Sequence, residues 1–476
     1  MTVEIQKTSF LDSIIEKGIL FLLIFTPLAF GAVQDWAAAV MELVAFLVLA
    51  AWLLKAGVRG QGETVQDTRL LTLFGIIVLV ILLQLIPLPQ ELLRKLTPST
   101  ADIYSDFSHD SPGTWRSISL YPWATQQYLL KLLAYVAVFF VIINHYRDRE
   151  RVERLVRSIL FLAFSLVVFA FLQKATWNGR IFWLYPIEAH AESERNFAIW
   201  GPFINRNHFA GYLEMVIPLG LAMVLYHASE TDRFLDRSWT GRLASFISSR
   251  RFASLGLWGT MSLVMAGALF MTLSRGGIIA FLLSMTALFL LARMRRGLKK
   301  RIGPLAFIGL ALLLMIMTAG WDKIEERFEQ LGEEQHLRRA EVWKDSLQIV
   351  KDFPLLGTGF GTFGNIYPKY QTHSSTALYD HAHNDYVEML TDMGLLGFAA
   401  FGALCTGFVI LVFRQWLSRH RAYVKAMGAG GMASCGAMFI HGMTDFNLHI
   451  PSNAMLLTVV AGITWTTVFN VGRNEV

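Results

Sequence analysis

The chain has 476 residues, of which 54% are hydrophobic and only 16% are charged, and it includes 35 Phe and 13 Trp. This composition excludes an ordinary soluble globular protein and indicates a chain that crosses a membrane several times. The net charge of +6 does not indicate nucleic-acid binding, because in a membrane protein the distribution of Lys and Arg over the loops matters more than their sum.

Twelve apolar runs are long enough to cross a bilayer core, which takes about 20 helical residues. Because the bilayer core offers no water, their backbone groups must bond within each segment, so we expect helices. The first run lacks the basic segment and cleavage site of a signal peptide, and we predict that it is retained. The predicted fold is an all-α polytopic membrane protein, a single integral membrane domain over residues 1–476. The twelve predicted spans are 14–33, 36–56, 69–87, 127–145, 154–174, 208–227, 254–274, 276–292, 304–320, 386–413, 427–444 and 453–472.

Basic residues concentrate in the loops that follow every second span. These loops are 57–68, 146–153, 228–253, 293–303 and 414–426, and the last two contain no acidic residue. The positive-inside rule then places both termini in the cytoplasm. We expect the same loops to contact anionic membrane lipids.

The opposite loops, on the outer side, contain the unusual polar clusters. We predict that the longest of them, residues 321–385, is a large outer loop that carries part of a functional site. The other outer segments are 88–126, 175–207, the turn from Ser274 to Gly277, and 445–452.

Several arginines lie in the outer segments, and the positive-inside rule explains basic residues only in the cytoplasmic loops. Arg275 lies between two spans with almost no loop around it, and Arg206, Asn207 and His208 enter the sixth span. An arginine at a helix end often only snorkels to the interface, and polar residues there often only cap the helix. The alternative is a pocket for an anionic group, which Arg338 or Arg339 of a predicted helix from Glu333 to Lys351 would complete.

A polar, titratable segment runs directly into the tenth span. Helical spacing from Asp385 onward places His381, Asp385, Glu388 and Asp392 on one side of a helix. His383 and Asn384 stand where that helix begins, and Gly394 and Gly397 stand where it can bend. A polar helix cap is the simpler interpretation of His383 and Asn384, as a turn with its cap is for Asp445 and His449.

Two familiar kinds of site are not predicted. Gly357, Gly359 and Gly361 lack the following Lys-Ser/Thr of a phosphate-binding loop and do not lie between a strand and a helix. His381 and His383 are not joined by a Cys or carboxylate at a spacing that indicates a metal. We therefore expect neither a nucleotide nor a metal site.

In chain order, several motifs resemble those of the O-antigen ligase and polymerase superfamily of bacterial envelope glycosyltransferases. Its signature is His followed by Asn, Ser or Gln, nine residues, and Gly-x-x-Gly, and here His383-Asn384 and Gly394-Leu-Leu-Gly397 have that spacing. Further matching segments, within a resemblance that covers about residues 200–450, are Asn205 to Ala210, Ser274-Arg275, Arg339-x-x-x-Trp343 and Pro354-Leu-Leu-Gly357-Thr-Gly359.

The resemblance implies a multi-helix membrane glycosyltransferase (GT-C-like) fold in the bacterial inner membrane, with its site at the periplasmic face. Its members transfer a glycan from an undecaprenyl diphosphate carrier to an acceptor hydroxyl, with inversion and without a metal, cofactor or nucleotide sugar. In that chemistry His383 suits the catalytic base, because a neutral imidazole accepts a proton near neutral pH. Arg206, Arg275 and one of Arg338 and Arg339 suit diphosphate binding, since guanidinium groups match phosphate oxygens. The supporting residues would be Asn207, His208, His381, Asn384, Asp445 and His449.

The resemblance leaves two possible acceptors of the transferred glycan, which correspond to a ligase and a polymerase. A ligase transfers finished chains to the lipid A core of lipopolysaccharide, whereas a polymerase extends a carrier-linked repeat, as in exopolysaccharide synthesis. The segments 445–451 and 117–125 slightly favour a polymerase.

Two alternatives come from other classes of protein. A flippase or transporter of lipid-linked glycans would also have many spans and basic inner loops, but the halves 1–238 and 239–476 show no internal repeat. A scaffold for envelope assembly would leave the outer arginines unexplained.

Overall fold

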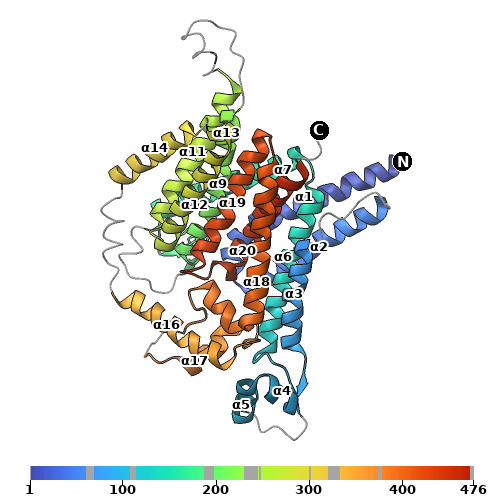
Figure 1. Cartoon of the computed structure of the whole chain (residues 1–476). Helices are drawn as coiled ribbons and strands as arrows, with labels where there is room; N and C mark the ends of the chain where they lie inside the picture. The colour runs from blue at the N-terminus through green and yellow to red at the C-terminus, as the bar shows by residue number, and fades with distance from the viewer. Residues whose placement is uncertain are drawn as a thin grey trace.

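A helix coincides with each of the twelve predicted spans in the computed structural model (Figure 1), which describes residues 2–59, 69–107, 114–186, 198–229, 245, 248–299, 302–319, 333–373 and 378–471. Among these residues, eight helices are long and apolar enough to cross a membrane, and Leu70–Leu85 and Gly303–Leu314 are shorter apolar helices. The prediction of an all-α polytopic membrane protein is confirmed.

The helices at the predicted spans are α1 (Thr2–Leu28), α2 (Asp35–Arg59), α3 (Arg69–Leu85), α6 (Pro122–His145), α7 (Arg149–Ala175), α9 (Arg206–Ser229), α11 (Arg250–Met271), α12 (Arg275–Met294), α14 (Gly303–Ala319), α18 (Asp385–Ser418), α19 (Ala422–His441) and α20 (Pro451–Thr466). Shorter helices are α4 (Gln90–Leu96), α5 (Pro98–Phe107), α13 (Arg296–Lys299), α16 (Glu333–Asp352), α17 (Phe363–Tyr370), η1 (Phe30–Ala32), η3 (Asn447–His449) and η4 (Thr467–Val471). The two small antiparallel pairs are β1 (Leu88–Pro89) with β2 (Trp115–Arg116), and β3 (Arg180–Ile181) with β4 (Tyr185–Pro186).

Helix α9 is the centre of the bundle and is buried along its length. It packs against α19, α11 and α12, and small residues bring these helices close. A Cβ added at Gly220 would lie 2.4 Å from the Ser262 hydroxyl, and one at Gly430 would lie 2.8 Å from the Pro218 carbonyl oxygen. Small residues serve this purpose in membrane bundles, where apolar side chains gain nothing by leaving lipid for protein.

Helix α18 bends at Gly394, whose φ of 62° and ψ of −169° are not helical. The sequence predicts that the helix can bend here, and in the structure a neighbouring backbone segment packs against the bend. The Leu395 and Leu396 N–H groups donate to the carbonyl oxygens of Pro354 and Leu355, and the Gly359 N–H donates to the Asp392 carbonyl. The segments 354–361 and 391–396 therefore bond through their backbones.

The described parts of the predicted outer loop 321–385 form a small hydrophobic core of their own. Val342 and Ile349 of α16 pack with Phe363 and Tyr367 of α17 and with Ala382. Figure 1 shows α16 and α17 at the same end of the bundle as α4 and α5, away from the chain termini. This core supports the segment that leads into α18.

Candidate functional site

Three helices that are distant in sequence begin at one end of the bundle, and each has a polar residue before its first turn. Asn384 accepts hydrogen bonds from the N–H groups of Tyr386 and Val387 at the start of α18. Ser274 accepts from Gly277 at the start of α12, and Asn205 accepts from the Asn207 N–H at the start of α9. The cap interpretation of Asn384 is thus confirmed, and three positive helix ends lie at the same end of the molecule.

The turn between α19 and α20, residues 442–450, lies among these helix starts. The Asp385 N–H of α18 donates to the Gly442 carbonyl at 2.8 Å. On the α12 side, a Cβ added at Gly276 would be 2.5 Å from the Thr444 hydroxyl. Arg339 of α16 donates to the Thr444 carbonyl at 2.7 Å. The turn therefore joins the outer loop to the starts of α12 and α18.

His383 and Asp445 form a pair within this arrangement. His383 Nδ1 lies 3.5 Å from Asp445 Oδ1, and Asn207 of α9 donates to Asp445 Oδ2 at 2.6 Å. The carboxylate is buried, while the imidazole side chain remains 29% exposed. With Nδ1 directed at Asp445, Nε2 is the ring atom available to a ligand.

The carboxyl group of Asp445 is held in its ionised form. Burial raises the pKa of Asp445, but the nearby His383 imidazole and the charges of His208 and Arg339 lower it by more, and the pKa lies well below its usual range. A permanently ionised carboxylate behind an imidazole favours the Nδ1–H tautomer and stabilises the ring when it gains a proton.

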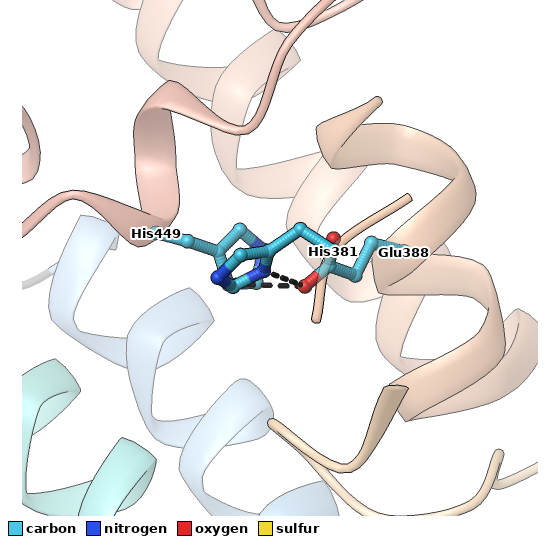
Figure 2. A group of neighbouring side chains, drawn as sticks. All are labelled: His381, Glu388 and His449. Atoms are coloured by element: carbon cyan, nitrogen blue, oxygen red, sulfur yellow. Dashed lines mark hydrogen bonds and ion pairs between the residues drawn. The ribbon is translucent and has the colours of Figure 1, made fainter. Parts of the chain in front are cut away.

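A second cluster surrounds Glu388, one turn into α18. Glu388 Oε1 lies 2.7 Å from His381 Nδ1 and 3.4 Å from His449 Nδ1, while Oε2 accepts the Ala382 N–H at 2.9 Å. Figure 2 shows the two imidazole rings meeting at this carboxylate. Because Ala382 and His381 are both held, Glu388 fixes the chain immediately before His383.

The two histidines bound to Glu388 differ in their pKa values. Burial lowers the pKa of His381, but the charge and hydrogen bond of Glu388, together with the charges of Asp380 and Asp445, outweigh burial, so the net shift is upward. Burial lowers the pKa of His449 to about 4, although Glu388 opposes the shift. Near neutral pH the cluster therefore holds a neutral His449 and a more basic His381.

His381, Glu388 and His449 also have the composition of a metal site. Their ligand atoms all lie within 4.8 Å of one another. Two imidazoles and a carboxylate are a common zinc ligand set. The 2.7 Å approach of His381 to Glu388 also fits a direct charge-assisted hydrogen bond. The prediction that the protein needs no metal remains a prediction.

Phe446 connects the histidines of both clusters. The His381 ring stacks on it with centroids 4.2 Å apart, and the rings of His383 and His208 meet it edge to face at 5.0 and 4.9 Å. The predicted supporting residues His208, His381, Asp445 and His449 thus come together around one turn. Nothing in their spacing along the chain shows this arrangement.

The arginines that were predicted to bind diphosphate differ in their burial and in their contacts. Arg206 is buried at the start of α9, and Arg275 is half-buried at the start of α12. Arg339 reaches the turn at Thr444, beside Asp445. The side chain of Arg338 lies outside what the structure describes.

One buried pair inside the helical bundle was not predicted from the sequence. Glu214 of α9 and His441 of α19 are fully buried, and His441 Nδ1 lies 3.1 Å from both Glu214 carboxylate oxygens. A Cβ added at Gly276 would lie 3.0 Å from His441 Nε2, so the pair lies beneath the start of α12. An ionisable residue within an apolar run was the available signal, since such residues are rare and usually functional.

An apolar cavity of about 220 Å³ begins at the Glu388 cluster and extends along the spans. His449, Tyr128 and Phe360 line it near the cluster, and Phe408, Cys435 and Leu457 line it deeper in the bundle. Almost all of its lining is apolar, so it suits a hydrocarbon chain.

Part of the chain matches a known protein family. Residues 260–402 match the family described as O-antigen ligase, a region that includes α12, α16 and the first half of α18. A search of curated protein sequences finds no match to the chain. The matched region contains Arg275, Arg339, His383 and both glycine segments of the α18 bend. The match covers less than half of the chain, and it supports the resemblance to the O-antigen ligase and polymerase superfamily that the motifs predicted.

Proposed function

We propose that the protein is a membrane glycosyltransferase that moves an undecaprenyl-diphosphate-linked oligosaccharide to an acceptor hydroxyl at the periplasmic face. The observation that carries the proposal is the contact of His383 with a buried, ionised Asp445 at a point where three helix starts meet. Helix starts and arginines favour a diphosphate, and the imidazole suits proton removal.

His383 Nε2 takes the proton of the acceptor hydroxyl as its oxygen attacks the anomeric carbon. The new glycosidic bond forms on the face opposite the departing diphosphate, so the configuration inverts, and the diphosphate leaves with the electron pair of the broken bond. Asp445 balances the positive charge that His383 gains. General-base assistance of this kind contributes about 10²- to 10⁴-fold to a rate.

The leaving diphosphate carries the charge that must be stabilised as the bond breaks. We assign this role to Arg206, Arg275 and Arg339, together with the positive starts of α9 and α12. Fixed donors of this kind stabilise developing charge without a metal. The proposal therefore predicts that activity persists after dialysis against a chelator, and a loss of activity restored by Zn²⁺ would instead assign His381, Glu388 and His449 to a metal.

The apolar cavity supports a lipid-linked substrate. It runs from His449, beside the catalytic cluster, along α18 and α20 toward the middle of the bundle. A polyprenyl chain in this cavity would hold its diphosphate near the helix starts. A free oligosaccharide would gain nothing from it, because sugars do not prefer an apolar lining.

The segments 445–451 and 117–125 resemble those of polysaccharide-polymerising members and slightly favour a polymerase over a ligase, and both lie at the site end of the bundle. The turn 445–451 forms the site itself. In the segment 117–125, the Leu120 N–H donates to the Thr358 carbonyl, and Ser119 packs against Gly359. A carrier-linked single repeat supplied alone separates the two functions: lengthened chains identify a polymerase, and product only after addition of a lipid A core acceptor identifies a ligase.

The catalytic proposal is tested with His383→Ala and Arg275→Ala in a reconstituted transfer assay. Each should abolish detectable glycan transfer while the protein still inserts and purifies normally. Arg293→Ala, an exposed arginine at the other end of α12, removes the same charge and should leave transfer unchanged. Normal transfer by the first two variants would refute the proposed mechanism, and movement of the lipid-linked glycan across vesicles without new glycosidic bonds would favour a flippase.

A further inference from the structure

A second cavity lies at the opposite end of the bundle from His383. It has a volume of about 290 Å³ and is lined by Arg149, Tyr226, Arg421, Tyr423 and Val471. Tyr226 lies near the end of α9, the helix whose start holds Arg206, so the rise of about 1.5 Å per residue separates the two ends by about 30 Å. This cavity is therefore independent of the candidate catalytic site.

Arg149 is held in place by two aromatic rings. Its guanidinium carbon lies 4.8 Å from the ring centres of both Tyr226 and Tyr423, and it donates to the Tyr226 hydroxyl. Its Nε also lies 3.4 Å from Glu153. These contacts use two of the five N–H donors of a guanidinium, so the positioned group retains donors for a ligand.

Tyr423 provides a second, independent indication of a ligand. Its side chain is 3% exposed, and among the described residues its hydroxyl has no hydrogen-bond partner. A buried hydroxyl without a partner costs free energy, so such groups usually meet a ligand or water. This hydroxyl belongs to a residue that lines the cavity.

The start of α19 adds backbone donors. Ala422, Tyr423 and Val424 form its first turn and line the cavity. Within the described part of the chain, no side chain caps this turn. The first N–H groups of a helix favour an anion when no cap satisfies them.

We propose that this cavity binds the phosphodiester of an anionic phospholipid. Two arginines, one tyrosine hydroxyl and an uncapped helix start are a donor set for phosphate oxygens. The cavity lies between the start of α7, the end of α9 and the start of α19, at the end of the bundle that the basic loops predict to be cytoplasmic, where those loops would meet anionic headgroups. A phospholipid headgroup is present at that level, whereas a soluble phosphate must arrive from solution.

The test measures binding of dioctanoyl phosphatidylglycerol to the purified full-length protein by native mass spectrometry. Arg149→Gln should weaken binding about tenfold, because it removes a charged donor. Tyr423→Phe should weaken it about threefold and retains the ring packing against Tyr226, so it remains informative even if the arginine variant fails to fold. Arg414→Gln, an exposed arginine near the same end of α18, should bind as the parent does.

Two further probes identify the source of the phosphate. Dioctanoyl phosphatidylcholine, which has no net charge, should bind far more weakly than phosphatidylglycerol. Inorganic phosphate should compete only at much higher concentration. Equal binding of phosphatidylglycerol by the parent and both cavity variants would overturn the proposal, and so would inorganic phosphate that binds as tightly as the lipid.

Discussion

His383 and Gly394 stand at the two ends of the same motif, and both have a positive φ, 51° and 62°. Their surroundings differ. The His383 side chain is partly exposed and faces Asp445, whereas a Cβ at Gly394 would lie 2.5 Å from the backbone carbonyl of Leu355. At Gly394 the neighbouring backbone leaves no room for any side chain. At His383 a backbone conformation that is unfavourable for residues other than glycine directs the imidazole towards Asp445.

Within this motif, His383 is the candidate chemical group and the glycines are structural. Gly394 and Gly357 let two segments bond through their backbones, and Gln84 of α3 adds hydrogen bonds to the carbonyls of Leu356 and Asp392. These backbone contacts between segments 354–361 and 391–396, called the seam below, fix the first turns of α18, which carry Glu388. Glu388 in turn holds the segment before His383.

The largest expected effect is that of Gly394→Ala. The added Cβ would collide with the Leu355 backbone, and the φ and ψ of this residue belong to a region that only glycine adopts readily. We expect loss of folded protein, measured as the monodisperse yield on size exclusion. Gly402→Ala, in the same helix with open space around it, should express as the parent does or better, since Ala favours a helix by about 1 kcal/mol. Normal yield of Gly394→Ala would mean that the seam is not needed for folding.

Asp445→Asn should have the next largest effect, on turnover. The amide keeps the shape of the side chain but removes the charge behind His383, so kcat should fall about 10²-fold, at the lower end of general-base effects. KM for the lipid-linked donor should not change, because Asp445 positions the base and does not bind the diphosphate. Asp102→Asn, an exposed carboxylate of α5, serves as the control. A raised KM with normal kcat would assign Asp445 to substrate binding.

The long helices could be predicted from the sequence because about twenty apolar residues in a row have few other solutions. The helix from Glu333 and the bend at Gly394 followed from local spacing and from glycine. The grouping of His381, Glu388 and His449 did not, since it depends on how the turn at Asn447 packs against α18. Glu214 and His441 are distant in sequence, and only the packing of α9 on α19 makes them a pair.

A smaller effect is expected on stability at the start of α18. A residue other than glycine at positive φ costs about 1–2 kcal/mol, so His383→Gly should stabilise the fold by about 1 kcal/mol while it abolishes transfer. Asn384→Ala removes the cap and should destabilise by about 1 kcal/mol. Thermal unfolding in detergent measures both changes. A destabilised His383→Gly protein would show that the imidazole supports the fold as well as the proposed reaction.

The smallest expected effect concerns the pH dependence of folding stability. His381 and His449 contact the same Glu388 carboxylate, but their pKa values are shifted in opposite directions. His381 has a raised folded pKa, so its contribution to stability is complete below about pH 6.5 and is lost as pH rises through the folded value. His449 has a folded pKa of about 4, so the unfolded chain binds its proton more readily, and the fold loses stability as pH falls from about 6.5 toward 4.

Unfolding midpoints between pH 4.5 and 8.5 distinguish the two histidines. The stability advantage of the parent over His381→Gln should shrink as pH rises above 6.5. The advantage over His449→Gln should shrink as pH falls below 6.5, because the glutamine has no proton to bind. Parallel curves for the parent and both variants would mean that neither ring titrates differently in the folded protein. In that case Glu388 would hold the segment before His383 through the Ala382 N–H alone. The contact between Glu388 and His381 would then contribute little to the position of His383.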